Sequence, residues 1–110
     1  MVEPEPRIRK GDLSTQIQVL VKFSDYNDTI NVVDMSVASS QKITFLDPDG
    51  NTLGPFNTTN VNTGTDGLVK YITNGTTSQW TKAGIWRFFI TYTNSSGTYS
   101  TNDAIREVLE

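Results

Sequence analysis

The sequence predicts an all-β fold, an antiparallel sandwich, and three observations lead to this prediction. Between residues 86 and 92 every second side chain is large and apolar, as in a strand with one buried face. Asp47-Pro48-Asp49-Gly50 and Gly64-Thr65-Asp66-Gly67 are turn sequences that adjoin further apolar runs. The chain has 110 residues, of which 35% are hydrophobic, so we expect one domain with a modest core and many solvated strand faces.

Residues 1–12 differ in character from the rest of the chain. Pro4 and Pro6 favour an extended path, and the charged residues around them leave no face that could be buried. We therefore expect an extended N-terminal arm over residues 1–12, followed by a sandwich over residues 13–110.

The first strand of the sandwich is expected at residues 17–23, where apolar side chains occupy the odd-numbered positions. Residues 32–33 could start a short strand, and residues 34–38 are expected to cover one end of the sandwich. In the next strand Ile43 and Phe45 should point inward, before the turn at residues 47–50 reverses the chain.

The second half of the chain alternates between broken and regular strands. Residues 53–61 contain Gly54 and Pro55, so a strand there should be broken and lie at an edge. Val69 and Tyr71 should point inward from the following strand. A polar crossover at residues 74–82 then leads to the longest strand.

The C-terminal part of the chain is expected to complete the sheets. The turn at residues 94–97 closes a hairpin onto residues 98–100. Residues 103–110 have helical propensity, but in an all-strand context we expect a final strand. The apolar side chains available to that strand are Ile105, Val108 and Leu109. About seven strands in a chain of this length is the count of an immunoglobulin-like antiparallel β-sandwich.

The composition excludes several kinds of chemistry. The chain has neither cysteine nor histidine, so it has no thiol nucleophile, no imidazole base and no zinc site with sulfur or nitrogen ligands. Asp47, Asp49 and Asp66 lie in turns, where aspartate hydrogen-bonds its own backbone. We therefore expect no enzyme, no catalytic residue and no cofactor.

The net charge and the distribution of basic residues indicate which classes of partner to expect. The net charge is -3, and basic residues are thinly spread apart from Arg7, Arg9 and Lys10, so we expect no nucleic-acid partner. No apolar run is long enough to span a bilayer, and no signal segment is visible at the start. We expect a soluble chain with no membrane partner.

Two short motifs have a simpler interpretation than the site they suggest. Asp47, Asp49 and Asn51 have the alternating spacing of a calcium loop, but Gly50 stands at the fourth loop position rather than the sixth. We therefore expect a plain turn and no metal site. Four glycosylation acceptor patterns begin at Asn27, Asn57, Asn74 and Asn94. In a chain so rich in Asn, Ser and Thr, about two such matches arise by chance, so we assign them no role.

Several of these turns and strands occur in a recognisable order. The motifs are Lys10-Gly11-Asp12, Asp34-Met35-Ser36, Ile43-Thr44-Phe45, Pro48-Asp49-Gly50, Thr65-Asp66-Gly67-Leu68-Val69-Lys70-Tyr71 and Ala83-Gly84-Ile85-Trp86. From about Arg9 to Val108 their order resembles the immunoglobulin-like domain at the start of phage baseplate upper proteins. Similar small domains recur in tail, fibre, neck and capsid-decorating proteins of tailed phages. The resemblance implies a non-enzymatic virion protein, whose partners are other virion proteins and further copies of itself.

Three features of the chain are candidates for contact with such a partner. Residues 7–9 of the arm could add to the sheet edge of a neighbour. Ile85 and Phe89 lie on the reverse face of the longest strand, where a solvated sheet face should be polar. Trp80 either plugs an end of the sandwich or stands exposed as a contact. The candidate partner-binding residues are therefore Arg7, Ile8, Arg9, Trp80, Ile85 and Phe89.

The aromatic residues allow a second class of function. Trp80, Tyr92 and Tyr99 could stack on the apolar face of a sugar, whereas Trp86 is in phase with the core. The alternative is therefore a secreted or surface adhesion module that binds carbohydrate, for instance a host-surface glycan. A regulatory or enzyme-associated sandwich is a third class.

Overall fold

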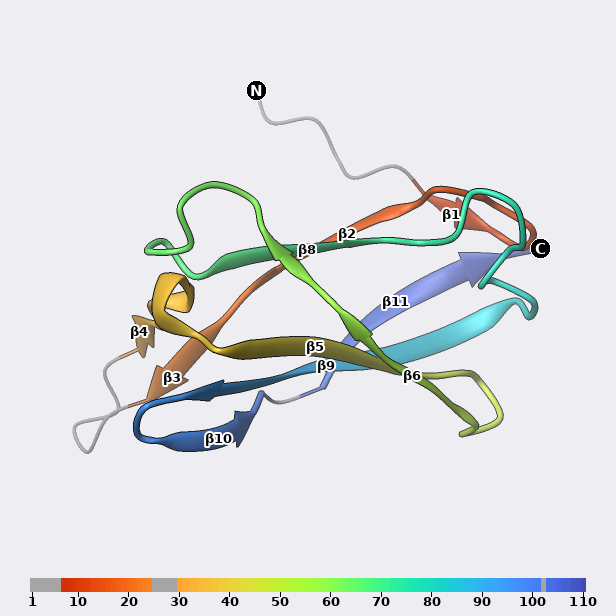
Figure 1. Cartoon of the computed structure of the whole chain (residues 1–110). Helices are drawn as coiled ribbons and strands as arrows, with labels where there is room; N and C mark the ends of the chain where they lie inside the picture. The colour runs from red at the N-terminus through yellow and green to blue at the C-terminus, as the bar shows by residue number, and fades with distance from the viewer. Residues whose placement is uncertain (1–6, 25–29, 102) are drawn as a thin grey trace, which may run out of the picture.

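The computed structural model describes residues 7–24, 30–101 and 103–110, and within them the protein is all-β (Figure 1). The strands are β1 (Ile8–Arg9), β2 (Gln16–Leu20), β3 (Lys22–Ser24), β4 (Ile30–Val32), β5 (Ser40–Leu46), β6 (Thr52–Asn57), β7 (Thr59–Asn60), β8 (Leu68–Ile72), β9 (Gly84–Asn94), β10 (Gly97–Ser100) and β11 (Ala104–Leu109). A short 3-10 turn, η1 (Met35–Val37), precedes β5. No helix in these described ranges is long and apolar enough to cross a membrane.

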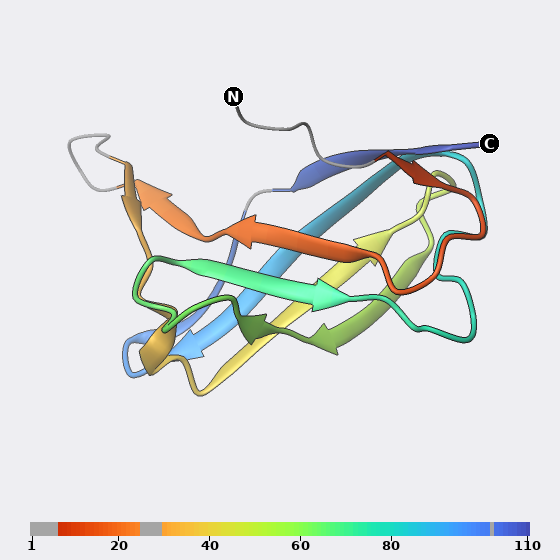
Figure 2. The ribbon, with the colours of Figure 1, turned by 90° about the horizontal axis from the view of Figure 1, so that it is seen from above.

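The strands form one large sheet and two small ones. The main sheet has the order β1-β11-β9-β5-β6, and β10 also pairs with β9. Its pairings are antiparallel except for the parallel pair β1 and β11. The second sheet has the order β2-β8-β7, and β3 and β4 form a hairpin of their own. Figures 1 and 2 show β2 and β8 lying across one face of the main sheet, so the molecule has two layers.

The chain passes directly from one layer to the other at β6 and β7. β6 is the edge strand of the main sheet, next to β5, and β7 pairs with β8 in the second sheet. Gly54 and Pro55 lie within β6, and the register with β5 shifts between Ile43 and Phe45. The predicted broken edge strand is confirmed, because proline lacks the amide that an inner strand would need.

The core lies between the two layers. β9 contributes side chains from alternate positions, as predicted, and β5 contributes Ile43 and Phe45 in the predicted phase. The second sheet adds Ile17 and Val69 from its inner face. The buried hydrophobic residues are Ile8, Ile17, Val21, Val33, Met35, Ile43, Phe45, Val69, Trp80, Trp86, Phe88, Ile90, Tyr92 and Val108.

The predicted turns at both ends of the main sheet are confirmed. After β5, the Gly50 amide donates to the Asp47 carbonyl over 2.9 Å, and Gly50 has a φ of 86°, which favours glycine. β9 and β10 form the predicted hairpin, with Asn94 opposite Gly97. The last segment is a strand, as predicted, and Val108 is its buried residue.

The first strand departs from prediction at its C-terminal end. β2 stops at Leu20, and Val21 is buried between β2 and β3, where its amide donates to the Gly67 carbonyl over 2.8 Å. β3 then pairs with β4 in the separate hairpin, so Phe23 is exposed rather than inward. The alternation that begins at Ile17 therefore fails at Phe23, because the chain leaves the second sheet before it.

The N-terminal segment also differs from the expectation that it has no buried face. Ile8 is only 2% exposed and lies opposite Val108 in the parallel pair of β1 and β11. The Lys10 amide donates to the Leu109 carbonyl over 2.7 Å, which continues the pairing. Residues 7–12 are thus tied to the main sheet, while residues 1–6 of the expected arm lie outside the described residues.

Candidate interaction surface

The outer face of the main sheet, which points away from the second layer, carries an apolar surface. Because side chains alternate along a strand, burial of the even-numbered residues of β9 places Ile85, Arg87 and Phe89 on this outer face. Ile85 is 46% exposed, and Phe89 is partly exposed. Two of the predicted contact residues therefore lie together on one accessible face.

Strands β5 and β11, on either side of β9, extend this surface. Ile105 of β11 lies opposite Arg87 and is 65% exposed, and Leu46 of β5 lies opposite Arg87 on the other side. We call Leu46, Ile85, Arg87, Phe89, Ile105 and Glu107 the outer face. Antiparallel sheets with one solvated side normally show polar residues there, so these apolar side chains make the outer face a candidate interaction surface.

Only part of the outer face is predicted from the sequence. Ile105 was expected to be one of three residues that could fill the core, and Leu46 received no role. Their outward phase could have been inferred from Val108 and Phe45, because side chains an odd number of positions apart on a strand point to opposite faces. That inference needs the strand bounds, which the sequence did not define at β11.

The other predicted contact residues lie elsewhere. Arg7 and Arg9 are exposed near the β1 edge of the main sheet, where the Arg9 guanidinium donates to the Glu110 carbonyl over 3.3 Å. Ile8 and Trp80, by contrast, are buried within the chain. Their inclusion as partner contacts is corrected, because neither offers side-chain surface to a partner.

Trp80 plugs one end of the molecule, which is one of the two alternatives for it. Its side chain is 0% exposed, and its ring meets the Trp86 ring edge-on, with centroids 5.0 Å apart and an interplanar angle of 82°. It makes a second edge contact with Phe45 at 5.8 Å. Trp80 therefore offers no exposed ring face on which a sugar could stack.

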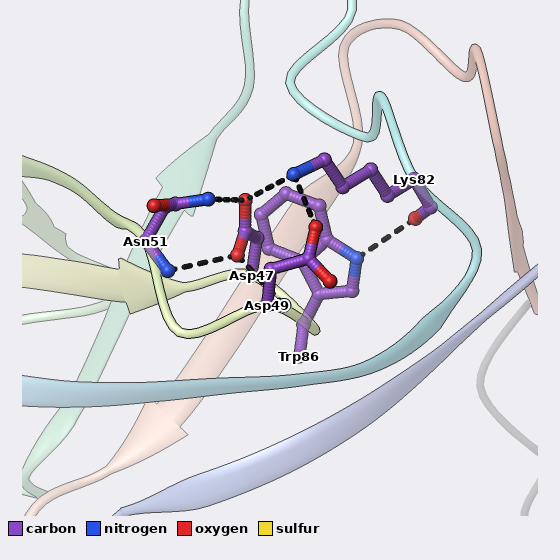
Figure 3. Close-up of polar contacts among 5 residues, drawn as sticks. All are labelled: Asp47, Asp49, Asn51, Lys82 and Trp86. Atoms are coloured by element: carbon purple, nitrogen blue, oxygen red, sulfur yellow. Dashed lines mark hydrogen bonds and ion pairs between the residues drawn. The ribbon is translucent and has the colours of Figure 1, made fainter.

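A polar cluster next to this plug fixes the turn after β5 (Figure 3). The Asp47 carboxylate accepts from the backbone amides of Asp49 and Asn51, both over 2.9 Å. The Lys82 ammonium reaches between two carboxylates, 3.1 Å from Asp47 Oδ2 and 2.6 Å from Asp49 Oδ2. The indole of Trp86 donates to the Lys82 carbonyl over 3.0 Å, so the cluster is joined to the core.

The electrostatics of this cluster follow from its hydrogen bonds. Burial of Asp47 disfavours its charged form, but hydrogen bonds from the Asn51 amide and from Lys82 outweigh this and lower its pKa from 3.8 to about 2. The same contacts, first with Asp49 and then with Asp47, raise the pKa of Lys82 above its ordinary value. The cluster therefore stabilises the turn after β5 through paired charges and hydrogen bonds.

The carboxylates with calcium-like spacing in this turn already have a cationic partner. The Lys82 ammonium already lies against the carboxylates of Asp47 and Asp49, in the place where a cation would bind. Within the described residues, no group of three or more His, Cys, Asp or Glu side chains is arranged to hold a metal ion.

An aromatic groove lies at the opposite end of the main sheet. Tyr92 and Tyr99 have ring centroids 5.6 Å apart, inclined at 34°, and Tyr99 is 44% exposed. Together with Phe23 and Ile30 of the β3-β4 hairpin they line a groove of about 500 Å³. Burial raises the pKa of Tyr92, and the neighbouring Tyr99 adds to this, so the Tyr92 hydroxyl stays neutral near pH 7.

Comparison with known proteins identifies no relative: no protein-family model matches the chain, and no curated protein matches it significantly.

Proposed function

We propose that the chain is a non-enzymatic structural or adaptor protein of a tailed-phage virion that acts through protein-protein assembly, and that its two layers form an immunoglobulin-like sandwich. The observation that carries this proposal is the outer face, where Ile85 and Ile105 are exposed on neighbouring strands of the main sheet. Several exposed apolar side chains on one face of a sheet are typical of a surface that a partner covers.

Two further features support this function. The motif order from about Arg9 to Val108 resembles immunoglobulin-like domains of phage virion proteins. The carboxylates of the turn after β5, which are candidates for acid-base catalysis by residue type, are engaged with Lys82 and with backbone amides. Both features favour a binding role, in a tail, baseplate, fibre, neck or capsid-decorating position.

The experiment that tests this function has two steps. Mass spectrometry of purified particles from the phage that encodes the chain should detect it as a virion component. In a phage that carries the double substitution Ile85→Lys and Ile105→Lys, the chain should fold but should be lost from the particles, because a charged outer face cannot be buried against a partner.

A matched control uses the second layer. Ile72 is exposed on the outer side of β8, so Ile72→Lys changes an apolar side chain in the same way but away from the outer face. This variant should be incorporated normally. Absence of the wild-type chain from the particles, or normal incorporation of the double variant, would contradict the proposal.

A carbohydrate-binding adhesion module is the second candidate, and the aromatic groove favours it. The exposed ring of Tyr99, which lies beside the buried Tyr92, can stack on the apolar face of a sugar ring. A screen of the chain against immobilised glycans tests this function. Binding that is lost in Tyr99→Ala and retained in Thr98→Ala, on the other face of β10, would support it.

A further inference from the structure

We propose that the outer face binds a second copy of this chain in a twofold dimer, in which Arg87 of each copy pairs with Glu107 of the other. This inference rests on the proposed function and adds the identity of one partner and the geometry of the contact. Four residues carry it: Ile85 and Arg87 of β9, and Ile105 and Glu107 of β11. We call them the outer quartet.

The strand register fixes the arrangement of the outer quartet. Arg87 lies opposite Ile105, and Ile85 lies opposite Glu107. Residues two apart on one strand are neighbours on the same face, so the four side chains form a small rectangle. The two isoleucines occupy one diagonal of this rectangle, and the two charges occupy the other.

Arg87 and Glu107 are the two charged members of the outer quartet. Across the described ranges, neither Arg87 nor Glu107 takes part in an ion pair, and both side chains are exposed. Burying this surface against an apolar partner would leave two unpaired charges out of water, which is strongly unfavourable. A suitable partner must therefore bring an acidic group to Arg87 and a basic group to Glu107.

A second copy meets this requirement in one orientation. In a face-to-face twofold dimer the axis lies in the interface, and the same patch is used on both copies. An axis along the strands, or perpendicular to them, would place each charge against an isoleucine. An axis along the Arg87-Glu107 diagonal would place each charged residue against the same residue of the other copy, and so against a like charge.

An axis along the Ile85-Ile105 diagonal is compatible with both kinds of residue. Each isoleucine then meets its own counterpart, and each Arg87 meets the Glu107 of the other copy. The strands of the two copies cross steeply, as in the orthogonal class of sheet packing. The quartet is therefore self-complementary in charge and in apolar contact.

The test exchanges the charges. Arg87→Glu places glutamates against one another, and Glu107→Arg does the same with arginines. Each single variant should therefore dimerise about a hundredfold more weakly than the wild type in sedimentation equilibrium. An equimolar mixture of the two variants should form a heterodimer, because every Glu then faces an Arg. The double variant should regain the homodimer.

Lys70 provides a control on the opposite side of the molecule. Lys70→Glu changes the charge by the same amount on the outer side of β8, and should dimerise like the wild type. A wild-type chain that stays monomeric at several hundred micromolar, single variants that dimerise normally, or a mixture that does not associate would each overturn the dimer.

A second measurement reports on the axis without changing the charges. The chain has no cysteine, so a single introduced thiol is unique. Ile85→Cys and Ile105→Cys lie on the proposed axis, and a short bis-maleimide should link each to its own counterpart. Leu20→Cys, exposed on the second layer, should not be linked. Equal linking of all three would contradict the geometry.

These results are separable from the proposed function. A chain that is found in particles but never self-associates would remove the dimer and leave the virion role. A chain that dimerises through the charge pair but is absent from particles would remove the virion role and leave the dimer.

Discussion

Trp86 joins the core of this protein to its surface charges. Its ring is fully buried against Trp80, and its indole nitrogen donates to the carbonyl of Lys82, whose ammonium pairs with Asp47 and Asp49. One residue therefore supports both the apolar packing and the position of the crossover before β9.

Trp86→Ala should lower the free energy of unfolding by about 3–5 kcal/mol, because it empties a large aromatic site in a packed core. Chemical denaturation measures this loss, which is a large part of the stability of a small domain. Phe23→Ala removes an aromatic ring from an exposed site and serves as the control. An unchanged midpoint in Trp86→Ala would mean that β9 has the opposite phase.

Asp47 should make the stability of the fold depend on pH in acid. Its pKa is about 2 in the folded chain against 3.8 as the reference, so protons bind more readily to the unfolded chain. The stability that this group contributes is complete above pH 3.8 and is lost as the pH falls toward 2.

Asp47→Asn should therefore show a smaller loss of stability than the wild type between pH 5 and pH 2. Urea denaturation at a series of pH values measures the difference. Asp66 retains a pKa lowered by Asn62 and by the Leu68 amide, so some acid sensitivity should persist. Asp103→Asn, at an exposed site, is the control, and a pH profile of Asp47→Asn identical to that of the wild type would contradict the role of the turn.

At the scale of single elements, the two-residue strand β1 contributes a side chain to the core. Ile8 is its one buried side chain, and it packs in the core beside Val108 of β11. An isolated isoleucine between charged residues carries no periodicity, so the sequence did not distinguish a strand from a free arm.

Ile8→Ala should lower the free energy of unfolding by about 2–5 kcal/mol, the usual range for a buried isoleucine. Val37→Ala removes a similar apolar side chain from an exposed position in η1 and should have little effect. Thermal denaturation of both variants makes the comparison. Equal melting temperatures would mean that residues 7–9 contribute to assembly alone.

The elements that sequence predicted well are those whose signal is local. The alternation in β9 and the turn at residues 47–50 are determined by neighbouring residues, so both could be predicted. The exposure of Phe23 and the burial of Ile8 depend on which strand pairs with which, and pairing is a long-range property. For the same reason, Ile85 and Phe89 were recognised as outward, whereas Ile105 was assigned to the surface only by the register of β11.

At the scale of the whole molecule, the two layers have different outer sides. On the second layer, Gln16, Gln18 and Lys70 separate the exposed apolar residues, whereas on the main sheet the apolar side chains of Leu46, Ile85, Phe89 and Ile105 surround Arg87. This asymmetry is the basis for proposing association through the main sheet. A twofold dimer through that side would leave the second layer and the aromatic groove available to other partners.

Dimerisation through the outer face should make the melting temperature depend on concentration. A partner that binds only the folded chain stabilises it by mass action, so each tenfold increase in protein should raise the wild-type melting temperature by about 2–4 °C. Arg87→Glu should shift this dependence to about hundredfold higher concentrations without lowering the melting temperature at high dilution, because Arg87 is exposed and supports no core contact. Scanning calorimetry of both chains over a hundredfold range of concentration provides the measurement. A concentration dependence that is unchanged in Arg87→Glu would place the association on another surface.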